Sequence, residues 1–241
     1  MSLIVHKGGH LVTRDDLALI EVPEVTESYM PVPHNHLADT LSTIGQDILK
    51  GFTLAKEQYA LAREGNQMFG VLVFKRENSE LGLSIGFRNS YDKSMAIGIA
   101  IGAEVFVCDN LALTGDITVL KKHTANVWAS LEDTAISTLY RSQRNFEKII
   151  EDSVSMKGKS IENSDAFKMI GLLFGNGVLT PRQLPVVKKE WLNPSYEDFR
   201  PRTMWSFYNA CTEALKSCPP IAIMEKHIAL HTLVIGQEGR A

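Results

Sequence analysis

The sequence predicts an α+β fold, with an antiparallel β-meander preceded by a short helix and followed by a long amphipathic helix and a helical C-terminal part. Two observations support this prediction. Between Gly51 and Cys108, short apolar runs alternate with polar turns of a few residues, which is typical of antiparallel strands joined by hairpins. From residue 124 onward, apolar residues recur at steps of three and four, which indicates an amphipathic helix.

The first 33 residues read as an extended arm, because short apolar runs alternate there with Pro23, Pro31 and Pro33. A short helix should follow the prolines, since apolar residues then stand at helical spacing. These residues are Leu37, Leu41, Ile44 and Ile48.

The meander is predicted from five apolar segments: FTLAKEQYALAR, MFGVLVFK, LGLSIGF, MAIGIAIG and EVFVC. Turn-forming sequences separate several of them, including ENSE at 77–80 and RNSYD at 88–92. Glycines inside the last strands indicate bulges or close backbone approach. They are Gly82, Gly86, Gly98 and Gly102.

Residues 124–155 are predicted to form one long helix, with an apolar face and a charged face. The apolar face holds Trp128, Leu131, Ala135, Leu139, Phe146 and Ile149. A mobile loop is expected at 156–164, followed by shorter helices, of which one begins at Arg202–Thr203. The apolar segment 221–235 fits a helix or a strand. We therefore divide the chain into an arm (1–33), an α+β core (34–155) and a mainly helical C-terminal region (156–241).

Length and composition predict a soluble globular protein with one large domain and an appendage. The chain has 241 residues, of which 44% are hydrophobic and 22% charged, which excludes a disordered or fibrous protein. Three cysteines without a CxxC pair suggest a reducing compartment. The start lacks a signal-peptide pattern, and no uncharged run approaches the roughly 20 residues of a membrane span. We expect a cytoplasmic protein that does not contact membranes.

The charge is unevenly distributed along the chain. Residues 1–120 carry 9 basic and 15 acidic side chains, whereas 121–160 carry 7 and 5, and 161–241 carry 9 and 8. Nucleic-acid-binding proteins usually show a basic surface, so any such surface here must be local.

The histidines do not predict a metal site. His227 and His231 would share a helical face, but zinc needs three or four ligands and no further ligand is evident nearby. Two packed histidines are the favoured interpretation, and the role of this pair stays open. No sequence pattern fits a phosphate-binding loop or another cofactor site, so none is predicted.

Catalysis has one weak candidate, a hydrolase built from Ser90, Asp92 and Cys108. Cys108 has no basic neighbour in the sequence to lower the pKa of its thiol. Serine and aspartate in one turn are also common turn residues that satisfy backbone groups. A structural turn is therefore favoured, and a non-enzymatic protein is favoured over an enzyme.

Basic and aromatic residues predict a local nucleic-acid-binding face. One face of a meander can remain in solvent, where aromatic and basic side chains would stack on bases and contact phosphates. The alternative is that the aromatic residues belong to the core and the charges are solvated. The candidate binding residues are Arg88, Tyr91, Lys93, Lys121, Lys122, Arg141 and Arg144.

Three short motifs add a family resemblance. They are Tyr29 with Pro31 before a helix, Asn89–Ser90–Tyr91–Asp92–Lys93 between strands, and Val107–Cys108–Asp109–Asn110 at a strand end. They resemble the Y-x-P, N-S-H-D-G and V-C-x-N motifs of a prokaryotic, phage- and plasmid-associated family, domain of unknown function nine-three-two. TMWSFYNACTEAL (203–215) is similar to the family's C-terminal helix. Tyr91 and Lys93 replace the family's histidine and glycine, which argues against a required general base or metal ligand there.

The resemblance implies a mobile-element context but no settled activity. The order of helix, meander and long helix is also similar, in topology alone, to Rad52-like single-strand annealing proteins, which form rings and bind DNA in a basic groove. The leading hypothesis is a phage- or plasmid-encoded, non-enzymatic protein of DNA metabolism or recombination that binds single-stranded DNA and forms homo-oligomers. The alternative is an anti-defence or structural factor that binds a host protein and no nucleic acid.

Overall fold

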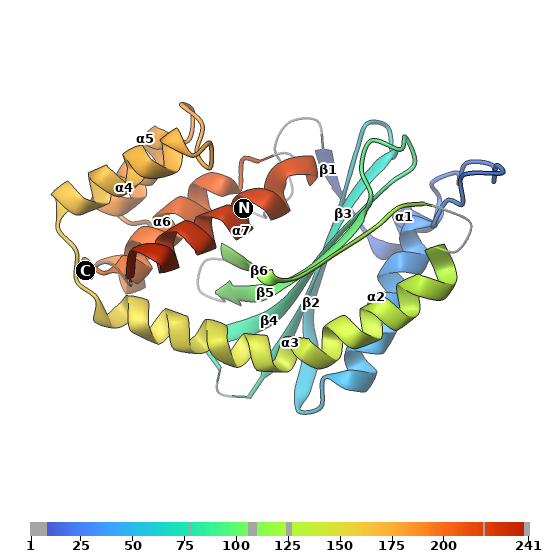
Figure 1. Ribbon diagram of the computed structural model, residues 1–241, viewed down its shortest axis with the longest axis horizontal. Helices are drawn as coiled ribbons and strands as arrows, with labels where there is room; N and C mark the ends of the chain where they lie inside the picture. Colours follow the sequence, from blue (N-terminus) through green and yellow to red (C-terminus); the bar gives the residue numbers. More distant parts are fainter. Residues whose placement is uncertain (1–8, 78, 106–109, 124–126, 219, 239–241) are drawn as a thin grey trace.

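The computed structural model describes residues 9–77, 79–105, 110–123, 127–218 and 220–238, with the backbone alone for 110–121, 128–129, 220–221 and 237–238. Within these residues, one antiparallel sheet has six strands that lie in sequence order (Figure 1). The strands are β1 (Gly9–Val12), β2 (Phe52–Ala62), β3 (Gln67–Arg76), β4 (Leu81–Ser90), β5 (Ile97–Val105) and β6 (Asn110–Lys121). The predicted α+β class and the meander are confirmed.

Helices precede and follow the sheet, as predicted. The helices α1 (Arg14–Ala18) and α2 (His34–Ile48) come before β2, and the long α3 (Val127–Gly158) follows β6. The rest of the chain forms α4 (Asn163–Gly175), α5 (Leu184–Leu192), the short 3-10 helix η1 (Glu197–Phe199), α6 (Met204–Leu215) and α7 (Pro220–Glu238). Figure 1 shows α4 and α5 at one end of the longest axis and α1 near the other.

Helices cover the two faces of the sheet. Successive side chains of a strand point to opposite faces, and Asn89 and Arg88 show which helix covers each. Asn89 contacts His34 of α2, whereas Arg88 lies 2.8 Å from Glu225 of α7. Since Arg76 of β3 is on the α2 face and pairs with Glu147 of α3, α2 and α3 cover one face and α7 lies on the other.

The hydrophobic core includes the contact of the sheet with α3 and extends to α6 and α7. The inward side chains predicted for the long helix are buried: Leu131, Ala135, Leu139, Phe146 and Ile149. The side chain of Trp128 lies outside the described residues. Close packing also explains one strand glycine, because a Cβ atom at Gly70 would lie 2.3 Å from the Phe87 ring on the neighbouring strand.

Two strand predictions need correction. The strand predicted over 81–87 continues to Ser90, so Arg88 and Asn89 are strand residues with opposite orientations and not turn residues. The sequence reading also ended the sheet at Cys108 and missed β6, which pairs with β5 along most of its length. Residues 106–109, including Cys108, lie outside the described residues.

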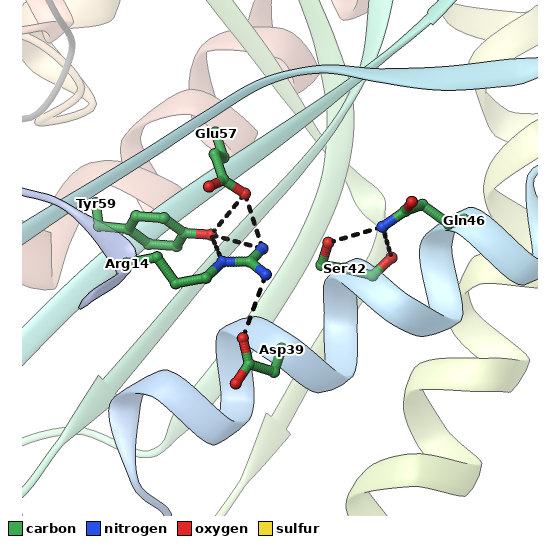
Figure 2. A network of polar contacts seen from close by, with 6 residues as sticks. All are labelled: Arg14, Asp39, Ser42, Gln46, Glu57 and Tyr59. Atoms are coloured by element: carbon green, nitrogen blue, oxygen red, sulfur yellow. Dashed lines mark hydrogen bonds and ion pairs between the residues drawn. The ribbon is translucent and has the colours of Figure 1, made fainter. Parts of the chain in front are cut away.

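Residues 9–33 contain more regular structure than the predicted extended arm. β1 pairs with the end of β2, from Gly9 opposite Ala62 to Val12 opposite Tyr59. Arg14 then fixes α1 to the core (Figure 2): its guanidinium lies 2.7 Å from Glu57, 3.2 Å from the Tyr59 hydroxyl and 3.3 Å from Asp39. The extended-arm prediction fails because these partners are distant in sequence and leave no local signal.

The C-terminal region also differs from expectation in two places. The predicted loop at 156–164 is too long, because α3 continues to Gly158 and Ser160 bridges to Thr203. The ambiguous segment 221–235 is helical within α7. No helix among the described residues is long and apolar enough to span a membrane. The division of the chain at residues 33 and 155 stays a prediction.

Candidate nucleic-acid interface

The turn that joins β4 to β5 is closed by its own polar side chains. Ser90 Oγ donates to the Met95 carbonyl over 2.9 Å, and Asp92 accepts from the Ser94 amide over 2.9 Å. Although partial burial raises the pKa of Asp92, hydrogen bonds from Ser94 and Gln67 lower it, and the net shift is downward. Ser90 and Asp92 therefore act as turn residues, as the favoured interpretation predicted.

Lys93 lies in this turn with a backbone conformation that is unfavourable for a lysine. Its φ is +59°, in the left-handed region that suits glycine. The side chain is exposed, and its ammonium lies 4.5 Å from the centre of the Tyr29 ring, where the π face attracts a cation. The turn thus holds a lysine at a strained position.

Beneath the turn, Asn89 links two buried histidines, forming what we call the His34–Asn89–His123 chain. Asn89 Nδ2 donates to the Val32 carbonyl over 2.6 Å and lies 3.0 Å from His34 Nδ1. His123 Nε2 lies 2.7 Å from Asn89 Oδ1, and His34 Nε2 lies 2.9 Å from the Gly65 carbonyl. Because carbonyl oxygens only accept, the proton must be on Nε2 in both histidines.

Both histidines of this chain are neutral near pH 7. Burial lowers the pKa of His34 to about 4, and the hydrogen bond to Gly65 only partly opposes this effect. Burial also lowers the pKa of His123. The chain is therefore a fixed, uncharged network that joins β4 to α2 and to the end of β6.

Two tyrosines enclose the His34–Asn89–His123 chain. The Tyr91 ring stacks on His34 with centroids 3.9 Å apart, and its hydroxyl accepts the His34 amide over 2.9 Å. The Tyr29 ring lies 5.5 Å from His123, and its hydroxyl donates to the Tyr91 carbonyl. Tyr29 and Asn89, which match the family motifs, are thereby brought together with Tyr91, which replaces the family's histidine.

A surface pocket of about 390 Å³ opens beside this network. We call it the lysine pocket. Its lining is Ser28, Tyr29, Lys93, Ser94, Met95, Ala96, Lys122 and His123. These lining residues include two exposed lysines and no carboxylate, so the pocket suits an anionic group.

The structure brings only some of the predicted binding residues to this pocket. Lys93 and Lys122 line it, whereas Arg88 and Tyr91 are buried, with 6% and 5% of their surface exposed. Arg88 pairs with Glu225 on the other face of the sheet, so burial corrects the expectation that Arg88 and Tyr91 touch a ligand directly. Lys121 ends β6, but its side chain lies outside the described residues.

Arg141 and Arg144 lie elsewhere, on the outer face of α3. Both are exposed, and at a rise of 1.5 Å per residue they lie roughly 21 Å and 26 Å along the helix from its first residue. Tyr140 precedes them and is 68% exposed. We call these three residues the α3 stripe. The sequence reading missed Tyr140, although it falls outside the apolar periodicity of α3 and so could have been recognised as exposed.

Other candidate chemistry is spread over the molecule. Among the described residues, no group of three or more His, Cys, Asp or Glu side chains is arranged to hold a metal ion. His231 of α7 lies 3.3 Å from Asp152 of α3, and His227 is fully buried. Burial raises the pKa of the Cys211 thiol, which disfavours a reactive thiolate there.

Comparisons with known proteins agree with the motif resemblance. No curated protein and no solved structure matches the chain. A family model, described as a domain of unknown function (DUF932), matches residues 23–222. This range includes the lysine pocket, the His34–Asn89–His123 chain and the α3 stripe. Since the match spans well over half of the sequence, the chain belongs to the DUF932 family.

Proposed function

We propose that this protein binds single-stranded DNA, with the lysine pocket and the α3 stripe as its contact surfaces. The observation that carries the proposal is the pocket itself, because Lys93 and Lys122 both line it and the described lining residues include no carboxylate. Backbone phosphates supply most of the affinity of such complexes, and lysines contact them as point charges. The protein would act non-enzymatically in the DNA metabolism or recombination of a phage or plasmid, a context suggested by its motifs.

The strain at Lys93 supports a role in binding. A lysine at φ +59° costs about 1 kcal/mol or more relative to glycine. Conformations of this kind persist where the surrounding structure and the function favour them. The cation–π contact with Tyr29 holds the ammonium at the pocket mouth, so the side chain is already ordered before a phosphate arrives.

The α3 stripe supports the same ligand class. Single-stranded binders combine basic side chains with exposed aromatic rings on which bases stack, and stacking is tolerant of sequence. Tyr140 is exposed on the same helical surface as Arg144, four residues later, and next to Arg141. A paired duplex would not offer its bases to this ring.

The direct test is the binding of a labelled single-stranded oligonucleotide, followed by fluorescence anisotropy. We expect binding at low salt that weakens about ten-fold or more between roughly 50 and 200 mM salt. An unlabelled duplex should compete less well than an unlabelled single strand. Absence of binding at low salt would overturn the proposal and favour the alternative, a factor that binds a host protein and no DNA.

Variants of Tyr140 test the stacking role separately. Replacing Tyr140 with Ala should weaken binding about ten-fold, since loss of one stacked base costs about 1–3 kcal/mol. Tyr140→Phe keeps the ring and should bind as the wild type does. Equal affinities for the two variants would remove Tyr140 from the interface.

A further inference from the structure

The segment that follows α1 exposes apolar side chains at regular steps. Leu19 is 81% exposed, Val22 40% and Val25 60%. Carboxylates alternate with them, because Glu21 and Glu24 are exposed as well. An exposed run that is both apolar and acidic is unfavourable in an isolated molecule and typical of a surface that meets a partner.

This segment is held firmly at both ends. Before it, Leu17 is buried and Arg14 anchors α1 to Glu57, Tyr59 and Asp39 (Figure 2). After it, Thr26 and Tyr29 exchange two backbone hydrogen bonds of 2.9 and 3.2 Å. The two ends of residues 19–25, which we call the N-terminal segment, are therefore anchored, and this limits the entropy lost on docking.

An apolar groove lies between α4 and α5. It has a volume of about 460 Å³, and its lining is Phe167, Ile170, Pro181, Leu184, Pro185 and Lys188. Two further apolar side chains of α4, outside this lining, are also in solvent: Phe174 is 46% exposed and Leu172 37%. We call the groove with its six lining residues the α4–α5 groove.

The N-terminal segment and the α4–α5 groove are complementary in charge. Residues 13–28 carry five acidic side chains and one arginine, a net charge of −4. Residues 163–192 carry four basic and two acidic side chains, a net charge of +2. Arg182 and Lys188 are exposed beside the groove, where they could face Glu21 and Glu24.

The two surfaces cannot meet within one molecule. Figure 1 shows α4 and α5 at one end of the longest axis and the chain that follows α1 at the opposite end. We propose that the N-terminal segment of one copy docks in the α4–α5 groove of a second copy of this chain. Because the two surfaces differ, the contact is head-to-tail, and it continues to a closed ring or an open filament.

The test is the molar mass in solution, measured by light scattering on size exclusion from about 1 to 100 μM, a range that covers moderate affinities. Two double variants each disable one surface: Leu19→Ser with Val25→Ser, and Phe167→Ser with Lys188→Glu. All four side chains are exposed, so both variants should unfold at the wild-type temperature. We expect the wild type to assemble beyond two chains and each variant alone to remain a single chain.

Mixing the two variants distinguishes head-to-tail docking from other contacts. Each variant keeps one intact surface, so an equal mixture should give a two-chain species and nothing larger. A wild type that stays a single chain at the highest concentration would overturn the inference. So would assembly of either variant alone, or a mixture that contains single chains only. The result does not depend on DNA binding, which is measured separately.

Discussion

The lysine pocket and the α4–α5 groove are built by different means. Figure 1 shows α4 and α5, which line the groove, at one end of the longest axis, and α2, which carries His34 of the network beside the pocket, toward the other end. At the pocket, buried polar groups form a connected hydrogen-bond network, and lysines stand at its edge. At the groove, α4 leaves apolar side chains in solvent and buries only Ala166 and Leu173. The first arrangement, lysines beside a rigid hydrogen-bonded network, suits the binding of an anionic ligand. The second, exposed apolar side chains, suits contact with another protein surface.

The largest expected difference between the two regions is in the free energy of unfolding that is lost when an asparagine is replaced. Replacing Asn89 with Ala leaves the Val32 carbonyl, His34 and His123 without their partner inside the protein. Each buried polar group that loses its hydrogen bond costs about 1–3 kcal/mol, so the free energy of unfolding should fall by at least about 3 kcal/mol. Urea unfolding monitored by circular dichroism measures this change.

Asn176 at the end of α4 is the matched control. Its side chain donates to the Leu172 carbonyl in an exposed setting. Asn176→Ala should therefore change the free energy of unfolding by less than about 1 kcal/mol, because water replaces the lost partner. Equal losses for the two variants would contradict the contrast between the two ends.

The next effect is the pH dependence that His34 contributes. The pKa of His34 is about 4 in the folded protein, against 6.5 for an exposed histidine. Between these values the unfolded chain binds a proton that the folded chain does not, so stability falls as the pH falls. The free energy of unfolding should drop by about 2 kcal/mol from pH 7 to pH 5 through this group. In the His34→Gln variant, the free energy of unfolding should change between pH 7 and pH 5 by less than half as much as in the wild type. An unchanged pH dependence would exclude His34 as its source.

A smaller effect is expected at Lys93. Lys93→Ala keeps the left-handed φ and loses the contact with Tyr29, whereas Lys93→Gly loses the contact but relieves the backbone. The glycine variant should be more stable than the alanine variant by about 1 kcal/mol. Thermal unfolding of the two variants measures the difference. A more stable alanine variant would show that the turn does not strain residue 93.

The sequence predicts elements with a regular residue pattern better than elements that depend on contacts distant in the sequence. The inward face of α3 is confirmed because its apolar residues repeat at three- and four-residue steps. β1 gives no such signal, since its four residues are fixed only by pairing with the end of β2. β6 was missed because Gly115 and Asp116 lie inside Asn110–Lys121 and resemble a turn.

The candidate site was likewise predictable only where a local sequence pattern defines its residues. Lys93 was identified from its place in a predicted turn, and Lys122 from its place where the long helix was predicted to begin. The burial of Arg88 depends on Glu225, which is 137 residues away in the sequence, and no local pattern shows this contact. Asn89 of β4 contacts both His34 of α2 and His123, which follows β6, so the network appears once these elements are assembled.

The most direct test of the account compares the salt dependence of oligonucleotide binding at the two ends of the molecule. Lys93→Ala with Lys122→Ala removes two charges from the lysine pocket, and Lys168→Ala with Lys189→Ala removes two exposed charges from α4 and α5. If both pocket lysines contact phosphates, the pocket variant should bind more weakly, and its slope of log affinity against log salt should be smaller by about 1.4. The control should keep the wild-type slope. A pocket variant with the wild-type affinity and slope would contradict the assignment of the lysine pocket.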